Sequence, residues 1–153
     1  MSSFTTRKGL VLAALSALAL PAAAHAQGAA ITWGPAPAVF PAGARMAVLQ
    51  GDPSKTELFT VRLDFPDGYR FPAHWHPTDE HVTVISGTFL VGMGDSIDLS
   101  KAMALGAGAF ITAGANMHHF AAARGHTIVQ VHAMGPFALT YVNPKDAPQT
   151  SSR

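Results

Sequence analysis

Two histidines and a glutamate in the middle of the chain have the types and the spacing of a metal-binding group. His74 and His76 stand two residues apart in a segment that we expect to be a strand, and on a strand this spacing places both imidazoles on one face, roughly 6–7 Å apart. Pro77-Thr78-Asp79 predicts a chain reversal, after which Glu80 opens the next strand and can face the same point. Two imidazoles and a carboxylate that converge in this way form a three-ligand platform for a divalent metal ion. The alternative is that these are ordinary polar residues at strand ends, where His-x-His pairs are common.

Short strands must position these groups. Runs rich in Val, Ile, Phe and Thr alternate with turn residues at a spacing of roughly 8–12 residues, which indicates a β-sandwich or barrel. The predicted strands are 46–50, 58–65, 70–76, 81–85, 88–92, 110–112, 119–122, 127–133 and 137–142. Residues 100–105 alone could form a short helical turn. The alternation within the strand after the reversal puts Glu80 on one face and His81 on the other.

The composition excludes several classes of protein. The chain has 153 residues, of which 48% are hydrophobic and 12% charged, and this length and balance predict one folded domain. The absence of cysteine excludes disulfides, a thiolate zinc site and a cysteine nucleophile. Ten basic residues against nine acidic ones give no basic field for nucleic acid. Eight histidines point instead to metal binding, since histidine is the commonest metal ligand.

The first 26 residues have the pattern of a secretory signal peptide. Arg7 and Lys8 precede an apolar run that ends at Pro21, and the small residues Ala24 and Ala26 predict cleavage after residue 26. The run is shorter than the ~20 residues of a membrane-spanning helix, so we expect a periplasmic or secreted protein with no membrane contact after cleavage. Removing two basic residues leaves eight against nine acidic ones, a net charge of −1. The expected organisation is a signal peptide (1–26), an irregular arm (27–45), a barrel domain (46–143) and a tail (144–153).

The segment from Gly68 to Gly87 resembles the first motif of the cupin superfamily, G-x5-H-x-H-x3-E-x6-G, with every fixed position present. A degraded second motif begins at Gly108, with Asn116 in place of the usual glycine. That change is mild because asparagine tolerates a positive φ. His119 falls on the ligand position of this motif. The resemblance covers roughly residues 46–142.

The resemblance implies an all-β fold, a single-domain cupin jelly-roll β-barrel with a metal ion inside near one mouth. It implies that the ion, a divalent Fe, Mn, Cu, Ni or Zn, is bound by His74, His76, Glu80 and His119, with one or two positions open. Locally, His118 is an alternative to His119, since adjacent strand residues face opposite sides. We prefer His119 because its spacing from Gly108 fits the motif.

Open positions on a metal ion suggest a small-molecule dioxygenase or oxidase, in which Glu80 could also accept a proton. A cupin that binds metal and a small ligand without turnover is an alternative, as is a non-redox isomerase or lyase. The arm and the outward-facing Trp75 would suit a homodimer contact. On the strand 127–133, Gln130 and His132 share a face and could orient a metal ligand or touch a bound substrate. Tyr141 could do so at the barrel mouth, although ordinary packing explains all three as well.

Overall fold

Two long antiparallel strands, β5 (Glu80–Met93) and β8 (His119–Met134), form the frame of the molecule in the computed structural model, which describes residues 30–149. Their register pairs Glu80 with Ala133 at one end and Met93 with His119 at the other. The pairing shifts between residues 84 and 88 of β5. Because both strands bend there, each contributes its two halves to the two layers, here called the first and second sheets, of one continuous nine-stranded sheet.

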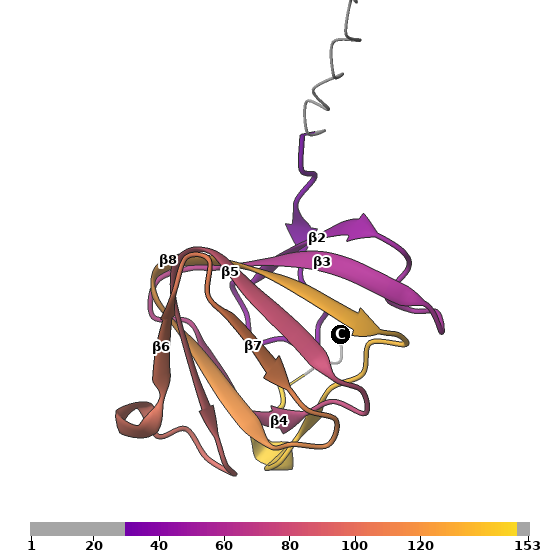
Figure 1. Ribbon diagram of the computed structural model, residues 1–153. Coiled ribbons are helices and arrows are strands. Elements are labelled where there is room, and N and C mark those ends of the chain that lie inside the picture. Colours follow the sequence, from indigo (N-terminus) through magenta and orange to yellow (C-terminus); the bar gives the residue numbers. More distant parts are fainter. Residues whose placement is uncertain (1–29, 150–153) are drawn as a thin grey trace, which may run out of the picture.

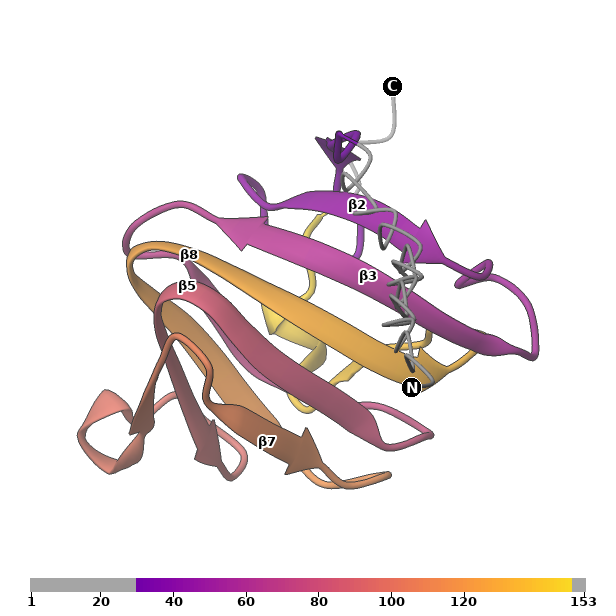
Figure 2. The same ribbon diagram turned by 45° about the horizontal axis from the view of Figure 1, so that its top comes forward.

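The other strands extend these two sheets, and every pairing is antiparallel. In the first sheet, β3 pairs with the second half of β8, and β2 and then β1 follow it outward. On the other side of this sheet, β7 lies beside the first half of β5 (Figures 1 and 2). In the second sheet, β4 pairs with the first half of β8 and β9 pairs with β4, while β6 lies beside the second half of β5. The two sheets curl into a jelly-roll β-barrel, which confirms the predicted all-β fold class. The bounds are β1 Gly34–Pro35, β2 Arg45–Gln50, β3 Leu58–Phe65, β4 Arg70–Trp75, β6 Met103–Gly106, β7 Phe110–Ala113 and β9 Thr140–Tyr141, with 3-10 turns η1 Leu99–Lys101 and η2 Pro144–Asp146.

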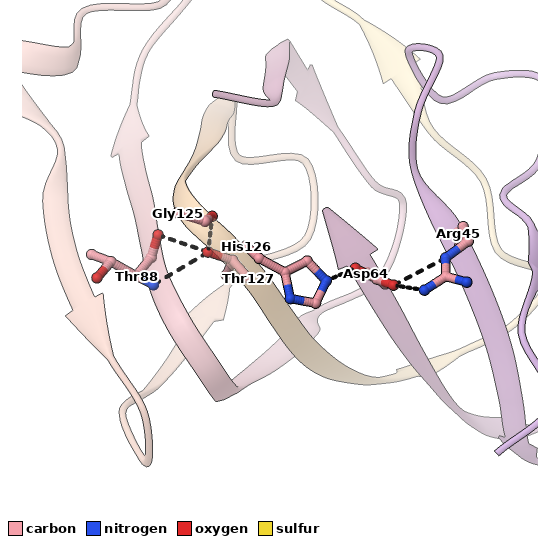
Figure 3. Close-up of polar contacts among 6 residues, drawn as sticks. All are labelled: Arg45, Asp64, Thr88, Gly125, His126 and Thr127. Carbon is pink, nitrogen blue, oxygen red and sulfur yellow. Dashed lines mark hydrogen bonds and ion pairs between the residues drawn. The ribbon is translucent and has the colours of Figure 1, made fainter. Parts of the chain in front are cut away.

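A buried threonine holds the bend where the sheets meet. The Thr127 side chain is fully buried, and its hydroxyl accepts a hydrogen bond from the Thr88 backbone N–H at 3.2 Å. The same hydroxyl lies within hydrogen-bond distance of the carbonyls of Thr88 and Gly125, one of which takes its proton (Figure 3). Gly87 has a φ of +79°, and a Cβ there would lie 2.3 Å from the His126 carbonyl oxygen. Glycine is therefore required at this bend.

The bend corrects the predicted strand boundaries. Residues 81–85 and 88–92 were expected to be separate strands but form the one strand β5, and 119–122 and 127–133 are joined in β8. The reason is that the turn residues between them act as bulges, which bend a strand without ending it. The predicted helical turn at 100–105 is divided between η1 and β6, and the predicted strand 137–142 is reduced to β9.

The core fills the space between the two sheets with the inward residues of each strand. Phe59, Val61 and Leu63 alternate with outward residues along β3, and Val129 and Val131 do so along β8. Burial of each such side chain contributes about 1.5–3 kcal/mol relative to an exposed position. The metal-binding candidates lie inside this apolar environment.

A polar network on the outside of the first sheet connects the arm to three strands. The carboxylate of Asp64, a residue only 4% exposed, accepts a 3.0 Å hydrogen bond from Arg45 Nε and a second from Nη2 of the same guanidinium (Figure 3). The Nε2 of His126 lies 2.6 Å from the other carboxylate oxygen. The Arg45 guanidinium also lies 5.5 Å from the Trp33 ring centroid, a cation–π contact. The network thus joins β2, β3, β8 and the residues before β1.

The expected segments outside the barrel are described only in part. Within the predicted arm, β1 pairs with β2 by placing Gly34 opposite Met46, and η2 lies in the predicted tail. The predicted signal peptide lies outside the described residues. Between residues 30 and 149, none of the helical segments has the length and apolar character needed to cross a membrane.

Candidate metal centre

Three histidines and one glutamate meet inside the barrel. His74 lies on β4, His76 follows that strand, and His119 opens β8, with one ring nitrogen of each within 4.8 Å of the others. The Glu80 carboxylate oxygen Oε2 lies 3.6 Å from His76 Nε2 and 3.7 Å from His119 Nε2. All four residues are buried, with exposures of 9% or less. The predicted His74, His76, Glu80 and His119 are thus brought together.

The strand register explains how residues so far apart in the sequence meet. β4 pairs with β8 so that His74 lies opposite His119, and the reversal after His76 returns the chain at Glu80. The expected alternation along β5 is also observed, because Glu80 lines the interior cavity while His81 lies on the outer face and bonds to Thr112 Oγ1 at 3.0 Å.

Backbone carbonyls fix the orientation of all three rings. The Nδ1 atoms of His74, His76 and His119 lie 2.7, 2.8 and 3.0 Å from the carbonyl oxygens of Pro72, Ala138 and Met117. A carbonyl only accepts, so each Nδ1 carries a proton, and each ring in its neutral form presents an Nε2 lone pair to the interior. The Nε2 of His76 is buried with no hydrogen-bond partner among residues 30–149. Nitrogen donors that converge in this way could hold a metal ion between them.

The environment keeps two of these groups, His74 and Glu80, in the states that bind metal. Burial, assisted by the neighbouring His119 and His76, lowers the pKa of His74 to about 3, so this ring is neutral. Burial alone would raise the pKa of Glu80, but its contact with His119 and the charge of His76 hold that pKa below its usual value. Burial opposes a charge on His119 too, yet Glu80 raises the pKa of that ring. A neutral imidazole and an ionised carboxylate are what a divalent cation needs.

The donor set fits a transition-metal ion. Nitrogen–metal bonds of about 2.1 Å require only a small inward movement of rings whose donor atoms lie within 4.8 Å of one another. Three imidazoles and one carboxylate suit Zn, Cu, Fe, Ni or Mn better than Ca or Mg, which prefer oxygen ligands alone. The three histidines could therefore hold a divalent transition-metal ion, and Glu80 is placed to join them.

The space beside the cluster is small and apolar. The interior cavity has a volume of about 30 Å³, enough for one or two water molecules. Apart from the cluster itself, its walls are hydrophobic side chains. The aromatic ones are Phe40, Phe65, Phe71, Phe89 and Phe137, and the others are Leu63, Val82, Val91, Ile111, Ala113, Ala121, Val129, Val131 and Leu139.

The structure distinguishes the two adjacent histidines of the second motif. His119 joins the cluster, whereas His118 lies on the surface with its Nδ1 2.7 Å from Asp95 Oδ1. Asn116 has a φ of +62°, the conformation for which asparagine is a mild replacement for glycine.

The remaining predicted site residues lie away from the cavity surface. Gln130 and His132 alternate with cavity-lining valines on β8 and face outward, where Gln130 accepts a 3.0 Å hydrogen bond from Arg62 and His132 lies 2.9 Å from Thr60 Oγ1. Tyr141 lies near the cluster, with its ring centroid 6.4 Å from that of His74, but its hydroxyl donates to the Val39 carbonyl at 2.6 Å. The structure therefore does not bring Gln130 and His132 to the cluster.

Sequence reasoning missed the aromatic walls. Phe71 and Phe137 have ring centroids 4.3 and 5.3 Å from those of His74 and His76, and Phe40 packs against both phenylalanines. Phe40 comes from a segment without a strand pattern, and Phe137 opens the predicted strand 137–142, which the structure reduces to β9, so periodicity did not place either ring. The one available signal was a large aromatic residue isolated among Ala, Pro and Gly at position 40.

Solved structures with the same fold support this description. At 24% identity and a TM-score of 0.60, the chain resembles a protein of Methylibium petroleiphilum PM1 whose proposed activity is that of an acetylacetone dioxygenase, with 78% of this chain and 81% of that one covered. An RmlC-like cupin from Shewanella frigidimarina NCIMB 400 matches at 20% identity and a TM-score of 0.50, covering 71% and 79% of the two chains. A salicylate 1,2-dioxygenase variant from Pseudoaminobacter salicylatoxidans, in complex with gentisate, matches at 12% identity and a TM-score of 0.53, covering 64% and 29%. At these identities the likeness establishes the fold.

The sequence comparison identifies the family. No curated protein matches the chain. The sequence model of the family described as the ChrR Cupin-like domain matches residues 21–138, which is most of the chain and includes both histidine motifs. The chain therefore belongs to the ChrR cupin-like domain family, within the cupin superfamily.

Proposed function

We propose that the protein is an exported metal-dependent oxidoreductase of the dioxygenase or oxidase type that acts on a small organic molecule. The metal ligands would be His74, His76, Glu80 and His119. The observation that carries the proposal is the convergence of three Nε2 lone pairs, one of them without a partner among the described residues, beside a buried carboxylate. Four protein donors leave one or two coordination positions open, as reaction at a metal requires.

The bound ion would supply activation of dioxygen next to an organic molecule, a chemistry suited to Fe, Mn, Ni or Cu. The chain would supply the surroundings. The carbonyls of Pro72, Ala138 and Met117 keep the three rings aimed at one point, and the apolar walls exclude bulk water.

Glu80 is the group that could move a proton. Its Oε2 lies near two imidazole nitrogens and its pKa is held below the usual value, so the carboxylate is ionised before reaction. The Oε2 atom would accept a proton from a carbon or hydroxyl of the substrate. Among the cavity-lining residues, the other ionisable side chains are the three histidines.

A second function, metal and ligand binding without turnover, is favoured by one observation. The cavity of about 30 Å³ holds no organic substrate in the described conformation. A protein that only binds an ion and a water-sized ligand would need no more room than this.

Metal analysis followed by a turnover screen tests both functions. The full chain is produced in the presence of Fe, Mn, Ni, Cu and Zn, the bound metal is measured by mass spectrometry, and dioxygen uptake is followed with diketones and phenols. His74→Ala tests the ligand role, and His126→Ala, which replaces an exposed histidine on the outer surface of β8, is the matched control. Stoichiometric metal with dioxygen uptake supports the enzyme, and stoichiometric metal without uptake supports the binding protein. A chain that binds none of the five metals contradicts both.

Export is a separate part of the proposal and rests on the basic flank, apolar run and Ala-His-Ala pattern of the first 26 residues. The N-terminal sequence of protein recovered from the periplasm or medium should begin at Gln27. Protein that remains in the cytoplasm with Met1 in place would refute this part alone.

A further inference from the structure

A closed surface loop carries one aromatic side chain into the cavity. The backbone N–H of Ala36 bonds to the Ala44 carbonyl at 3.2 Å, which ties together the ends of residues 36–44, named here the stopper loop. The loop contains no charged side chain, and most of its residues are exposed. Phe40 and Ala44 are buried, and Phe40, only 5% exposed, lines the same cavity as the histidine cluster. The Phe40 ring is therefore part of the cavity wall that the loop supplies.

Phe40 bridges the two aromatic rings that cover the histidines. Its centroid lies 5.0 Å from that of Phe71, which packs on His74, and 6.1 Å from that of Phe137, which stacks on His76. Withdrawing the Phe40 ring would therefore open space directly beside the cluster.

Two tyrosine hydroxyls hold the loop on either side of Phe40. Tyr69 donates to the Pro41 carbonyl at 2.8 Å, and Tyr141 donates to the Val39 carbonyl at 2.6 Å. Both tyrosine rings belong to the barrel core. Outside these contacts the loop borders a hollow of about 300 Å³, lined by residues of the loop itself together with Pro35 and Pro148. The loop is thus held at a few points and has free space beside it.

The second loop over the cavity is a poorer candidate for movement. Residues 135–139 carry Phe137, but the Ala138 carbonyl of this loop orients His76 through its Nδ1. The backbone N–H groups of Gly135 and Phe137 also bond to the carbonyls of Glu57 and Pro53. Moving this loop would misorient His76, whereas the stopper loop makes no hydrogen bond to any histidine of the cluster.

We propose that Phe40 is the stopper of the cavity and limits the size of molecule that reaches the Nε2 atoms of the cluster. A ligand larger than water or dioxygen enters when the stopper loop swings outward and its two tyrosine hydrogen bonds break. The proposal rests on the proposed function in one respect, which is that a small molecule must reach the cluster. It also reconciles a cavity of about 30 Å³ with an organic substrate.

Chemical modification of the histidines tests the stopper without metal or turnover. Diethyl pyrocarbonate, which is larger than the closed cavity and reacts with unprotonated imidazole nitrogen, is applied to the full chain after chelation. The rate at His76 is followed by peptide mass spectrometry and divided by the rate at exposed His126. Phe40→Ala should raise this ratio roughly tenfold or more, because the reagent no longer has to displace a buried aromatic ring, which costs free energy, before it reaches the histidines.

Two further variants make the result specific. Phe59→Ala is the matched control, since Phe59 is 1% exposed and packs 5.6 Å from Phe137 but does not line the cavity. It should leave the ratio unchanged. The double variant Tyr69→Phe with Tyr141→Phe keeps both rings, removes both hydroxyls and should raise the ratio about fivefold or more. This variant decides the question if Phe40→Ala does not fold, as judged by near-UV circular dichroism.

An unchanged ratio in folded Phe40→Ala, or an equal rise in Phe59→Ala, would overturn the stopper. If the double tyrosine variant is the one that folds, an unchanged ratio there overturns it as well. A protein that binds no metal contradicts the proposed function but leaves this measurement intact, so the two failures are distinguishable.

Discussion

Replacing His76 with leucine should change stability in opposite directions with and without metal. The Nε2 of His76 is buried without a hydrogen-bond partner among the described residues. Leaving such a group unpaired costs about 1–3 kcal/mol. The variant also loses the bond from Nδ1 to the Ala138 carbonyl, worth about 0.5–1.5 kcal/mol, but Ala138 is exposed and water can replace the donor. Without metal, His76→Leu should therefore be about 1 kcal/mol more stable than the wild type.

With metal present the order should reverse. At a free metal concentration 100 times the dissociation constant, binding stabilises the wild type by about 2.7 kcal/mol. Loss of groups that merely orient a ligand weakens binding by about 10–100-fold, so loss of a ligand should weaken it by at least the upper figure. Metal binding then stabilises the variant by at most about 0.4 kcal/mol at the same free metal concentration. For a domain of this size the two gains correspond to rises in Tm of about 10 °C and about 2 °C.

Urea unfolding followed by circular dichroism, in EDTA and in buffered Zn²⁺, gives the four free energies of unfolding that are needed. Zn²⁺ is chosen because it has no redox chemistry. The control is His81→Leu, since His81 lies on the outer face of β5 and bonds to Thr112. It should show the full stabilisation by metal. If His76→Leu is less stable than the wild type by the same amount in both buffers, the Nε2 of His76 has no role in metal binding and the reasoning fails.

Three other measurements check the remaining features. His119→Ala should lose bound metal while His118→Ala keeps it, and equal metal content in both, measured by mass spectrometry, would contradict the ligand assignment. Burial raises the pKa of Tyr141 to about 12 and that of Tyr69 further; the neutral phenols therefore stabilise the fold fully below their unfolded pKa near 10, and this stabilisation should be lost as the pH rises from about 10 to 12. Absorbance at 295 nm measures tyrosine ionisation, and ionisation of both tyrosines near pH 10 in the folded protein would contradict this prediction. Gly92→Ala should destabilise the fold by about 1–3 kcal/mol, because the new Cβ would lie 2.3 Å from a fully buried phenyl ring; a free energy of unfolding equal to that of the wild type would contradict this close packing.

The histidine pair and the glutamate were predictable because local rules were sufficient for them. Alternation along a strand puts His74 and His76 on one face, and a three-residue reversal brings back Glu80. The choice between His118 and His119 needed more, since adjacent residues face opposite sides. The pairing of His74 with His119 settles it, and that register depends on residues far apart in the chain.

Two features lay beyond local reasoning. The turn residues Ser86 and Gly87 indicated a strand end, but β5 continues because Thr127 on the neighbouring strand holds the bend. The arm was expected to be irregular, and the isolated aromatic residue Phe40 gave no indication of which part of the barrel it enters. That placement depends on hydrogen bonds from two distant tyrosines. In both cases the deciding partner lies tens of residues away.

The carbonyl acceptors of the three rings have a consequence for how this protein can change over evolutionary time. Pro72, Ala138 and Met117 contribute main-chain oxygens, which every amino acid possesses. A point mutation at any of these three positions can alter a side chain but does not delete the acceptor. The orientation of the imidazoles is therefore determined by the path of the backbone, and the surrounding side chains can change while the geometry of the three donors persists.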